Sequence, residues 1–172
     1  TVFKNVYYRG VVPGASNIPP RARRLKRTRR NFVTWPGFEM SNGGSRIFIQ
    51  STRPLTYSRA DEPGRIVIVL ERAHIHLRNN RNPLVTEHFN TPVSEAYLRR
   101  VRNTTRLVIE MKVNATASIR QVSQDGYHFL FVEFPGGNYP IPEGVRRGYR
   151  LGERQRIQRS RKSDDKAVAP LI

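Results

Sequence analysis

A strand–turn–strand unit occurs twice in the centre of the chain, and this internal repeat constrains the fold more than any other feature. The segment RIFIQ, which starts at Arg46, aligns with RLVIE, which starts at Arg106, at an offset of 60 residues. The segment GRIVIVLE, from Gly64, aligns with GYHFLFVE, from Gly126, at an offset of 62. Each unit is predicted to be a β-hairpin that is too short to bury its own apolar face. We therefore expect the two copies to form two small sheets around one shared core.

The residues around the repeat have the composition of β-strands. Runs rich in Ile, Val, Phe, Tyr and Thr are separated by turn sequences such as NGG, DEPG, NNRNP and SQDG. No window shows the 3.6-residue period of a helix, and Pro36-Gly37 is expected to break the first strand run. Five or six strands with turns every 8–12 residues predict an all-β, two-sheet sandwich.

The chain is strongly basic, and most of the excess charge lies at its two ends. The formal net charge is +18, of which residues 1–31 contribute +9, residues 32–135 only +4 and residues 136–172 +5. This predicts a basic N-terminal arm and linker (1–31), a β domain (32–135) and an extended basic C-terminal tail (136–172). The arm residues expected to bind a polyanion or a partner are Arg21, Arg23, Arg24, Lys26, Arg27, Arg29 and Arg30. The second basic arm comprises Arg146, Arg147, Arg150, Arg154 and Arg156.

The composition also excludes several classes of protein. With no cysteine, the chain has no disulfide scaffold, thiol nucleophile, cysteine-ligated zinc site or iron–sulfur cluster. No stretch approaches the roughly 18 consecutive apolar residues of a membrane span. No phosphate-binding glycine loop or catalytic-triad motif is present, so we expect no enzyme activity and no cofactor. The chain starts with Thr1, which a removed secretory signal would explain.

Three groups of side chains deserve testing as sites. His74 and His76 lie two residues apart on an expected strand and therefore on one face, and His88 and His128 are the candidates to complete a metal site. Solvated polar residues on a strand are the favoured interpretation, so we expect no metal. The carboxylates of the two hairpin turns are interpreted as turn formers rather than as an acid–base pair. These carboxylates are Asp61, Glu62 and Asp125. Tyr127, Phe129 and Phe131 share one face of a strand, which we expect to be the core face.

The repeated segments resemble the AMIN domain of Gram-negative envelope proteins. The resemblance covers about residues 35–135 and rests on SRIFIQSTRPLTYSRADEPGRIVIVLERAHIH and TRLVIEMKVNATASIRQVSQDGYHFLFVEFP. A duplicated architecture of two packed sheets is itself a feature of that family. The resemblance implies a periplasmic, non-catalytic module of the kind found at the front of cell-wall amidases and type IV pilus secretins. There it binds peptidoglycan or localises the protein in the envelope.

Two functions are therefore expected. The first is a periplasmic module that binds peptidoglycan and scaffolds an envelope assembly of the secretin, pilus or motor type, with envelope proteins as further partners. Arginine presents a planar fork to carboxylates, and the candidates on the domain faces are Arg46, Arg65 and Arg106. The alternative is a cytoplasmic, nucleic-acid-associated protein, an accessory component of a ribonucleoprotein that neutralises phosphates through its arginine-rich arms.

Overall fold

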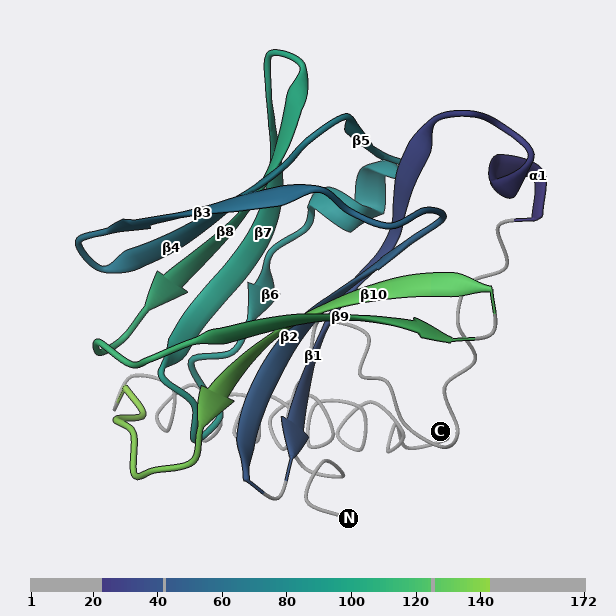
Figure 1. The fold of residues 1–172 in the computed structure, drawn as a ribbon. Helices are drawn as coiled ribbons and strands as arrows, with labels where there is room; N and C mark the ends of the chain where they lie inside the picture. Colours follow the sequence, from purple (N-terminus) through teal and green to yellow (C-terminus); the bar gives the residue numbers. More distant parts are fainter. Residues whose placement is uncertain (1–22, 42, 125, 143–172) are drawn as a thin grey trace, which may run out of the picture. The chain divides into compact units, whose positions relative to one another are not determined.

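The computed structural model describes residues 23–41, 43–124 and 126–142. Nearly all of them belong to the first of two compact units, residues 1–140 and 141–172. The described residues form ten β-strands, the one-turn helix α1 (Arg23–Lys26) and the 3₁₀ helix η2 (Arg78–Arg81) (Figure 1). The strands are β1 (Asn31–Ser41), β2 (Gly44–Ser51), β3 (Tyr57–Glu62), β4 (Arg65–Leu70), β5 (Ala73–Ile75), β6 (Leu84–Val85), β7 (Val93–Val101), β8 (Thr104–Met111), β9 (Ser118–Gln124) and β10 (Tyr127–Pro135).

The ten strands form two five-stranded sheets that pack as a sandwich, which confirms the predicted fold class. Sheet 1 has the strand order β5-β1-β2-β10-β9, and sheet 2 has the order β3-β4-β8-β7-β6. All neighbours are antiparallel except β5, which runs parallel to the start of β1. Read from opposite edges, the two orders match strand for strand. The duplication seen in the sequence is thus a duplication of the sheets.

The prediction that each repeated unit forms a hairpin of its own was wrong. The first strands of the two units are β2 and β8, and the second strands are β4 and β10. β2 pairs with β10 and β4 pairs with β8, so the strands of one unit lie in opposite sheets. The reason is that each unit contains an additional strand, β3 or β9, which occupies one edge of β4 or β10 through a tight turn. The free edge then pairs with the other half of the chain.

The turns of these two hairpins are equivalent. Glu62 lies opposite Arg65 in the first hairpin, and Gln124 lies opposite Tyr127 in the second, at the same offset of 62. Each turn has two residues, and the second is a glycine with φ of 74° at Gly64 and 76° at Gly126. A positive φ in a two-residue hairpin turn favours glycine because glycine has no Cβ. The glycine alignment in the sequence therefore marks a real structural equivalence.

The strand count and one strand break also differ from the prediction. Ten strands are present among the described residues rather than five or six, because three of the long apolar runs each contain parts of two strands. β1 continues through Pro36 and Gly37, which pair with Ile49 and Phe48 of β2. β5 pairs only with residues 31–33, so β1 is an edge strand from residue 34 onward. An edge strand tolerates proline because no partner on that side needs its missing N–H.

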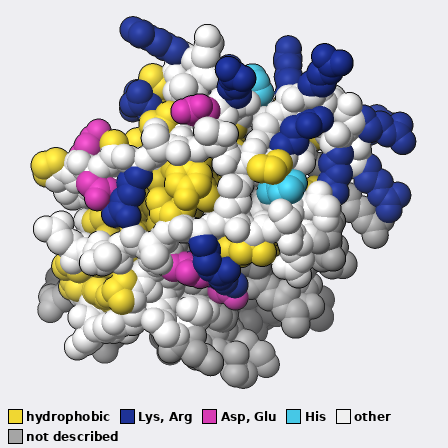
Figure 2. Space-filling view, viewed as in Figure 1, with side chains coloured by type: hydrophobic (Ala, Val, Ile, Leu, Met, Phe, Trp, Pro, Cys, Tyr) yellow, Lys and Arg dark blue, Asp and Glu magenta, His cyan; other side chains and the backbone are white. Residues whose placement is uncertain are grey.

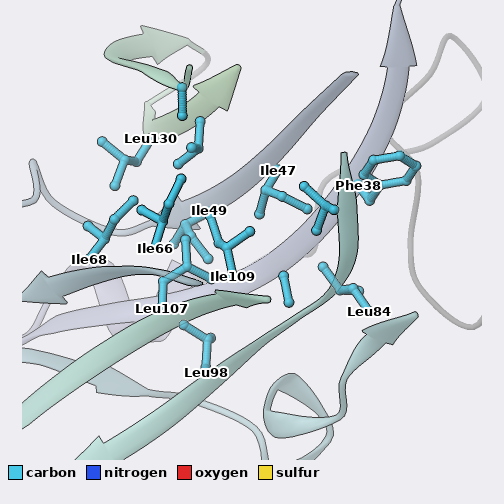
Figure 3. Close-up of a cluster of buried hydrophobic side chains, with 14 of the residues drawn as sticks. Phe38, Ile47, Ile49, Ile66, Ile68, Leu84, Leu98, Leu107, Ile109 and Leu130 are labelled. Carbon is cyan, nitrogen blue, oxygen red and sulfur yellow. The ribbon is translucent and has the colours of Figure 1, made fainter. Parts of the chain in front are cut away.

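The core lies between the sheets and is mainly aliphatic and aromatic, with a few buried hydroxyl groups such as the hydrogen-bonded pair Ser45 and Thr91 (Figure 3). Ile47, Ile49 and Leu130 point into it from sheet 1, and Ile68 and Ile109 point into it from sheet 2, all fully buried. Burial of one such side chain contributes about 1.5–3 kcal/mol to the free energy of unfolding. The inward residues alternate along each strand with residues that point away from the core. Those outward residues form the two outer faces.

Tyr127, Phe129 and Phe131 share one face of β10, as predicted, but it is the outer face and not the core face. Leu130 and Val132 of the same strand point into the core and are fully buried. Both faces of β10 are apolar, so the alternation of the sequence identifies the two sets of side chains without showing which set faces inward.

Candidate functional site

The described part of the N-terminal arm contains most of the predicted arm residues. Arg23, Arg24 and Lys26 lie on α1, and Arg27, Arg29 and Arg30 follow before β1. Lys26 is half-buried, with its ammonium group 3.7 Å from the centre of the Tyr127 ring. Arg53 donates from Nη2 to the Thr28 carbonyl at 2.9 Å. The short helix α1 therefore contacts the start of β10. Arg21 and the whole second arm lie outside the described residues, the latter comprising Arg146, Arg147, Arg150, Arg154 and Arg156.

The outer face of sheet 1 holds Arg46 in a closed ion-pair network. Arg46 donates from Nε to Oε2 of Glu39 at 2.7 Å, and its Nη1 lies 3.8 Å from Glu133. Arg120 donates to the same Glu133 oxygen at 3.0 Å, and this hydrogen bond raises the pKa of Arg120. The guanidinium carbons of Arg46 and Arg120 lie 4.4 and 4.8 Å from the centre of the Phe131 ring. Both arginines are thus neutralised and stacked, which favours a structural role.

The remainder of this face is an aromatic row. Trp35 packs edge-on against Phe48 with ring centres 5.2 Å apart, and Phe129 stacks on Phe131 at 6.0 Å. Trp35 is 3% exposed, and Phe48 and Gln50 are fully buried. The middle of this face is therefore buried.

The outer face of sheet 2 has the same geometry and different chemistry. Arg106 on β8 lies between Arg99 of β7 and Val69 of β4. No carboxylate among the described residues pairs with Arg106 or Arg99, and Nε of Arg106 is buried without a hydrogen-bond partner in that part of the chain. Arg99 is exposed and Arg106 is half-buried. Two neighbouring guanidinium groups with free donors are suited to bind a carboxylate or a phosphate.

The next positions along these strands complete the candidate site. Tyr97, Val108 and Val67 form an adjacent cross-strand row, in which each valine is 6% exposed. The Tyr97 hydroxyl donates to Oε1 of Glu110 at 3.3 Å, and burial together with Glu110 raises the pKa of Tyr97. The resulting surface has an apolar floor, one ring and a cationic edge. We call Arg99, Arg106, Tyr97, Val67 and Val108 the sheet 2 site.

Arg65, the third predicted face residue, lies at the far end of this outer face. Its Nη2 is 3.1 Å from Glu110, and its Nη1 is 3.9 Å from Glu62. The structure therefore places Arg65 and Arg106 on one face, two rows apart, and Arg46 on the opposite side of the sandwich. Of the three, only Arg106 lacks an acidic partner among the described residues.

The carboxylates of the first hairpin turn are likewise paired. Asp61 receives two hydrogen bonds from Arg59, at 2.8 and 3.1 Å, while Glu62 faces Arg65. Both line a shallow pocket of about 200 Å³ with Met111. The structure corrects their interpretation as turn formers, because both are paired residues of β3 and the turn itself is Pro63-Gly64. Asp125 lies outside the described residues.

The histidines do not come together. His74 and His76 both lie against the ring of Phe32, with ring centres 5.8 and 6.1 Å away. His128 contacts Ser123 at 2.8 Å, and His88 lies 3.9 Å from Glu87. Within the described ranges, no group of three or more His, Asp or Glu residues could hold a metal ion. Burial is the main cause that lowers the pKa of His74, followed by the nearby charges of Arg100 and Arg30.

Sequence reasoning missed Arg99 and Tyr97, although a signal for Arg99 was present. Extending the 60-residue offset upstream from Arg46 and Arg106 aligns Glu39 with Arg99. That difference, together with Val69 in the place that Glu133 takes beside Arg46, leaves Arg106 without a carboxylate neighbour on either adjoining strand. No comparable signal marks Tyr97, because its equivalent in the first half is Gly37.

The described residues thus form a β-sandwich whose sheet 2 face presents arginines, valines and a tyrosine. Residues 38–138 match the family model of the AMIN domain, and the chain belongs to the AMIN domain family. The AMIN domain is a non-catalytic, periplasmic module for targeting and peptidoglycan binding. No curated protein matches the chain. Among the described residues, no helix is long and apolar enough to cross a membrane.

Proposed function

We propose that this chain binds peptidoglycan in the periplasm of a Gram-negative bacterium through the sheet 2 site. The proposal rests mainly on one observation: Arg106 has no carboxylate partner in the described structure, whereas Glu39 and Glu133 neutralise the equivalent Arg46. Peptide stems of peptidoglycan carry carboxylates, which pair well with the fork of an arginine. A charged hydrogen bond of this kind contributes about 1.5–3 kcal/mol.

The rest of the site is suited to the sugar and methyl groups of the same polymer. A sugar ring presents an apolar face that can pack on the Tyr97 ring, and the alanine methyl groups of a peptide stem can pack on Val67 and Val108. On this proposal the chain is not an enzyme and needs no cofactor.

The basic arms would serve a different purpose. The described arm residues are exposed, apart from Leu25 and Lys26, and they extend from the edge of the sandwich at the start of β1. We propose that residues 1–31 and 136–172 hold neighbouring subunits or other envelope proteins in an assembly of the secretin, pilus or motor type. The β domain, residues 32–135, would then attach that assembly to the cell wall.

Co-sedimentation with purified sacculi at physiological salt tests the binding site. The Arg99→Gln/Arg106→Gln variant should lose binding by about tenfold or more, because both carboxylate donors are removed. The matched control is Arg46→Gln/Arg120→Gln, which removes the same charge from sheet 1 and should bind sacculi like the unmodified chain. Circular dichroism checks that both variants fold.

Two results would contradict the proposal. Equal sacculus binding by the Arg99/Arg106 variant and the unmodified chain would exclude the sheet 2 site. Binding to RNA that is tighter than binding to sacculi, with a steep inverse dependence on salt, would favour the nucleic-acid function instead.

A further inference from the structure

The charges of the sandwich are unevenly distributed. Most of the acidic residues seen in this view lie at the left and in the lower middle, close to arginines, and one lies among basic side chains near the top (Figure 2). Several basic side chains lie together at the end of the sandwich where β1 begins and where β7 turns into β8 (Figure 2). We call this end the basic end, and its residues are Arg30, Arg72, His74, Leu77, Arg78, Arg81, Arg100 and Arg102.

The arginines of the basic end are exposed and have no acidic partner in the described structure. Arg100 contacts Nδ1 of His74 at 3.0 Å, and Arg30 lies close enough to His74 to influence its charge. The 3₁₀ helix η2, with Arg78 and Arg81 at its ends, packs on β1, β5 and β7. Glu71 is the acidic residue nearest in sequence, and the described ion pairs do not include it. The basic end therefore has a net positive charge, and no ion pair in the described structure holds its arginines.

Two of these arginines occupy strained backbone positions. Arg72 has a φ of 52° and Arg102 a φ of 53°, in the left-handed region that favours glycine or asparagine. The turn equivalent to Arg102-Asn103 in the first half has the sequence Asn42-Gly43, which suits such a turn. Backbone strain that persists at an exposed position points to a function of the side chain. Both strained residues are arginines, and both lie at the same end.

An exposed apolar side chain lies in the same cluster. Leu77 is 50% exposed. Among the described residues it is the only large hydrophobic side chain that is exposed. It precedes η2 and is flanked by His76 and Arg78, which are also exposed. A purely polar polyanion such as RNA gains little from an exposed leucine. A bilayer surface combines anionic headgroups with an apolar layer beneath them, which matches basic residues around one leucine.

We propose that the basic end docks onto the anionic phospholipid headgroups of a bilayer, with Leu77 reaching toward the acyl region. The basic end adjoins the sheet 2 site, since Arg99 and Arg100 are neighbours on β7, but the two surfaces use different side chains. The proposal does not depend on peptidoglycan binding, because it uses different residues. It would place the described arm residues, which lead into β1 at this end, near the same headgroups.

Because the chain has no cysteine, one introduced cysteine can report from a chosen position. The full chain with Leu77→Cys, carrying an environment-sensitive dye, is mixed with vesicles of phosphatidylcholine with or without phosphatidylglycerol. We expect a blue shift of the dye only with phosphatidylglycerol. The control is the same dye at Ser58→Cys, an exposed position on β3, where we expect no shift. Vesicle binding without a shift at position 77 would assign the binding to the arms and overturn the proposal.

Substitution of the strained arginines separates loss of binding from loss of folding. Arg72→Gly/Arg102→Gly should weaken binding to the phosphatidylglycerol vesicles about tenfold. The melting temperature should not fall, because glycine relieves the left-handed strain. The charge-matched control is Arg59→Gln/Arg120→Gln, which should bind as the unmodified chain does. Equal binding by the two double variants, or a stronger response to RNA than to the vesicles, would overturn the proposal.

Discussion

The outer faces of the two sheets show how one duplicated framework supports two different surfaces. At equivalent positions, Arg46 lies between Glu39 and Glu133, whereas Arg106 lies between Arg99 and Val69. The first arginine is held at 2.7 Å by a carboxylate and stacks on a ring. The second has a buried Nε without a partner in the described structure. Replacement of the neighbouring carboxylates thus changes the central arginine from a structural group into a potential ligand-binding group.

The middle of both faces is buried, since Trp35 and Phe48 on sheet 1 and Val67 and Val108 on sheet 2 are at most 6% exposed. The two faces therefore differ in charge pairing more than in exposure. The sheet 2 face has exposed side chains at both ends, Arg99 and Glu62 among them. A duplicated fold can use one face for stability and leave the other for binding, because the two faces share the core but no surface residues. The predictions that follow exchange features between the faces.

The largest effect is expected when the sheet 2 face is made to resemble sheet 1. Arg99→Glu would place a carboxylate beside Arg106, as Glu39 lies beside Arg46. Because the new carboxylate competes with any anionic ligand, sacculus binding should fall more than tenfold. The new cross-strand ion pair should also raise the free energy of unfolding by about 0.5 kcal/mol.

Sedimentation with sacculi and urea denaturation measure the two effects on the same sample. A variant that is more stable but does not bind would show that the sheet 2 face is kept unpaired for function. Undiminished binding by Arg99→Glu would show that the two faces do not differ in the way proposed.

The reverse exchange tests the structural role of sheet 1. Glu39→Arg would remove the partner of Arg46 and place two like charges on neighbouring strands. Both side chains of the native pair are about three-quarters buried. We expect the free energy of unfolding to fall by about 1–2 kcal/mol. Urea denaturation measures this loss, and sacculus binding should be unchanged. If Arg99→Glu lowers the free energy of unfolding by the same amount, the loss in both variants is due to the position of the substitution and not to the change of charge.

The sequence predicts the fold class more reliably than it predicts strand pairing. The β-branched runs locate most of the strand-forming segments, and the glycines Gly64 and Gly126 locate the two turns, but the strands β3 and β9 that precede these turns were not recognised as separate strands. The composition of a strand does not show which strand it pairs with. The pairing of β2 with β10 and of β4 with β8, each across the two repeats, could therefore not be derived from the sequence. The inward side of β10 was assigned wrongly because Phe129 and Phe131 are as apolar as Leu130 and Val132.

The candidate site was predicted only in part for a similar reason. Arg46 and Arg106 look the same in the sequence, since each begins an aligned strand. The difference lies in the partner across the β1–β2 or β7–β8 hairpin, which only the register makes visible. The basic end depends even more on the fold, because Arg72 and Arg102 are 30 residues apart in the sequence and meet only where two turns share one end of the sandwich.

The smallest effect concerns the titration of His74. The arginines near His74 have no acidic partner in the described structure, unlike the paired arginines of sheet 1. Burial, Arg100 and Arg30 lower the pKa of His74 from its ordinary value of 6.5. The unfolded chain therefore binds more protons than the folded chain between that lowered pKa and pH 6.5. The stability contributed by neutral His74 is complete above pH 6.5 and is lost as the pH falls through the folded pKa. Thermal denaturation between pH 7.5 and 5 should show this loss, on the order of a few degrees or less.

His74→Asn should reduce that dependence on pH without abolishing it, because burial and Lys26 also lower the pKa of His128. His74→Asn/His128→Asn should remove both contributions. Arg100→Gln, which retains the imidazole but removes the neighbouring charge, should give an intermediate slope. If Arg100→Gln and the unmodified chain have the same slope, the arginines of the basic end do not act on His74. Solvent would then screen His74 from the charges of these arginines.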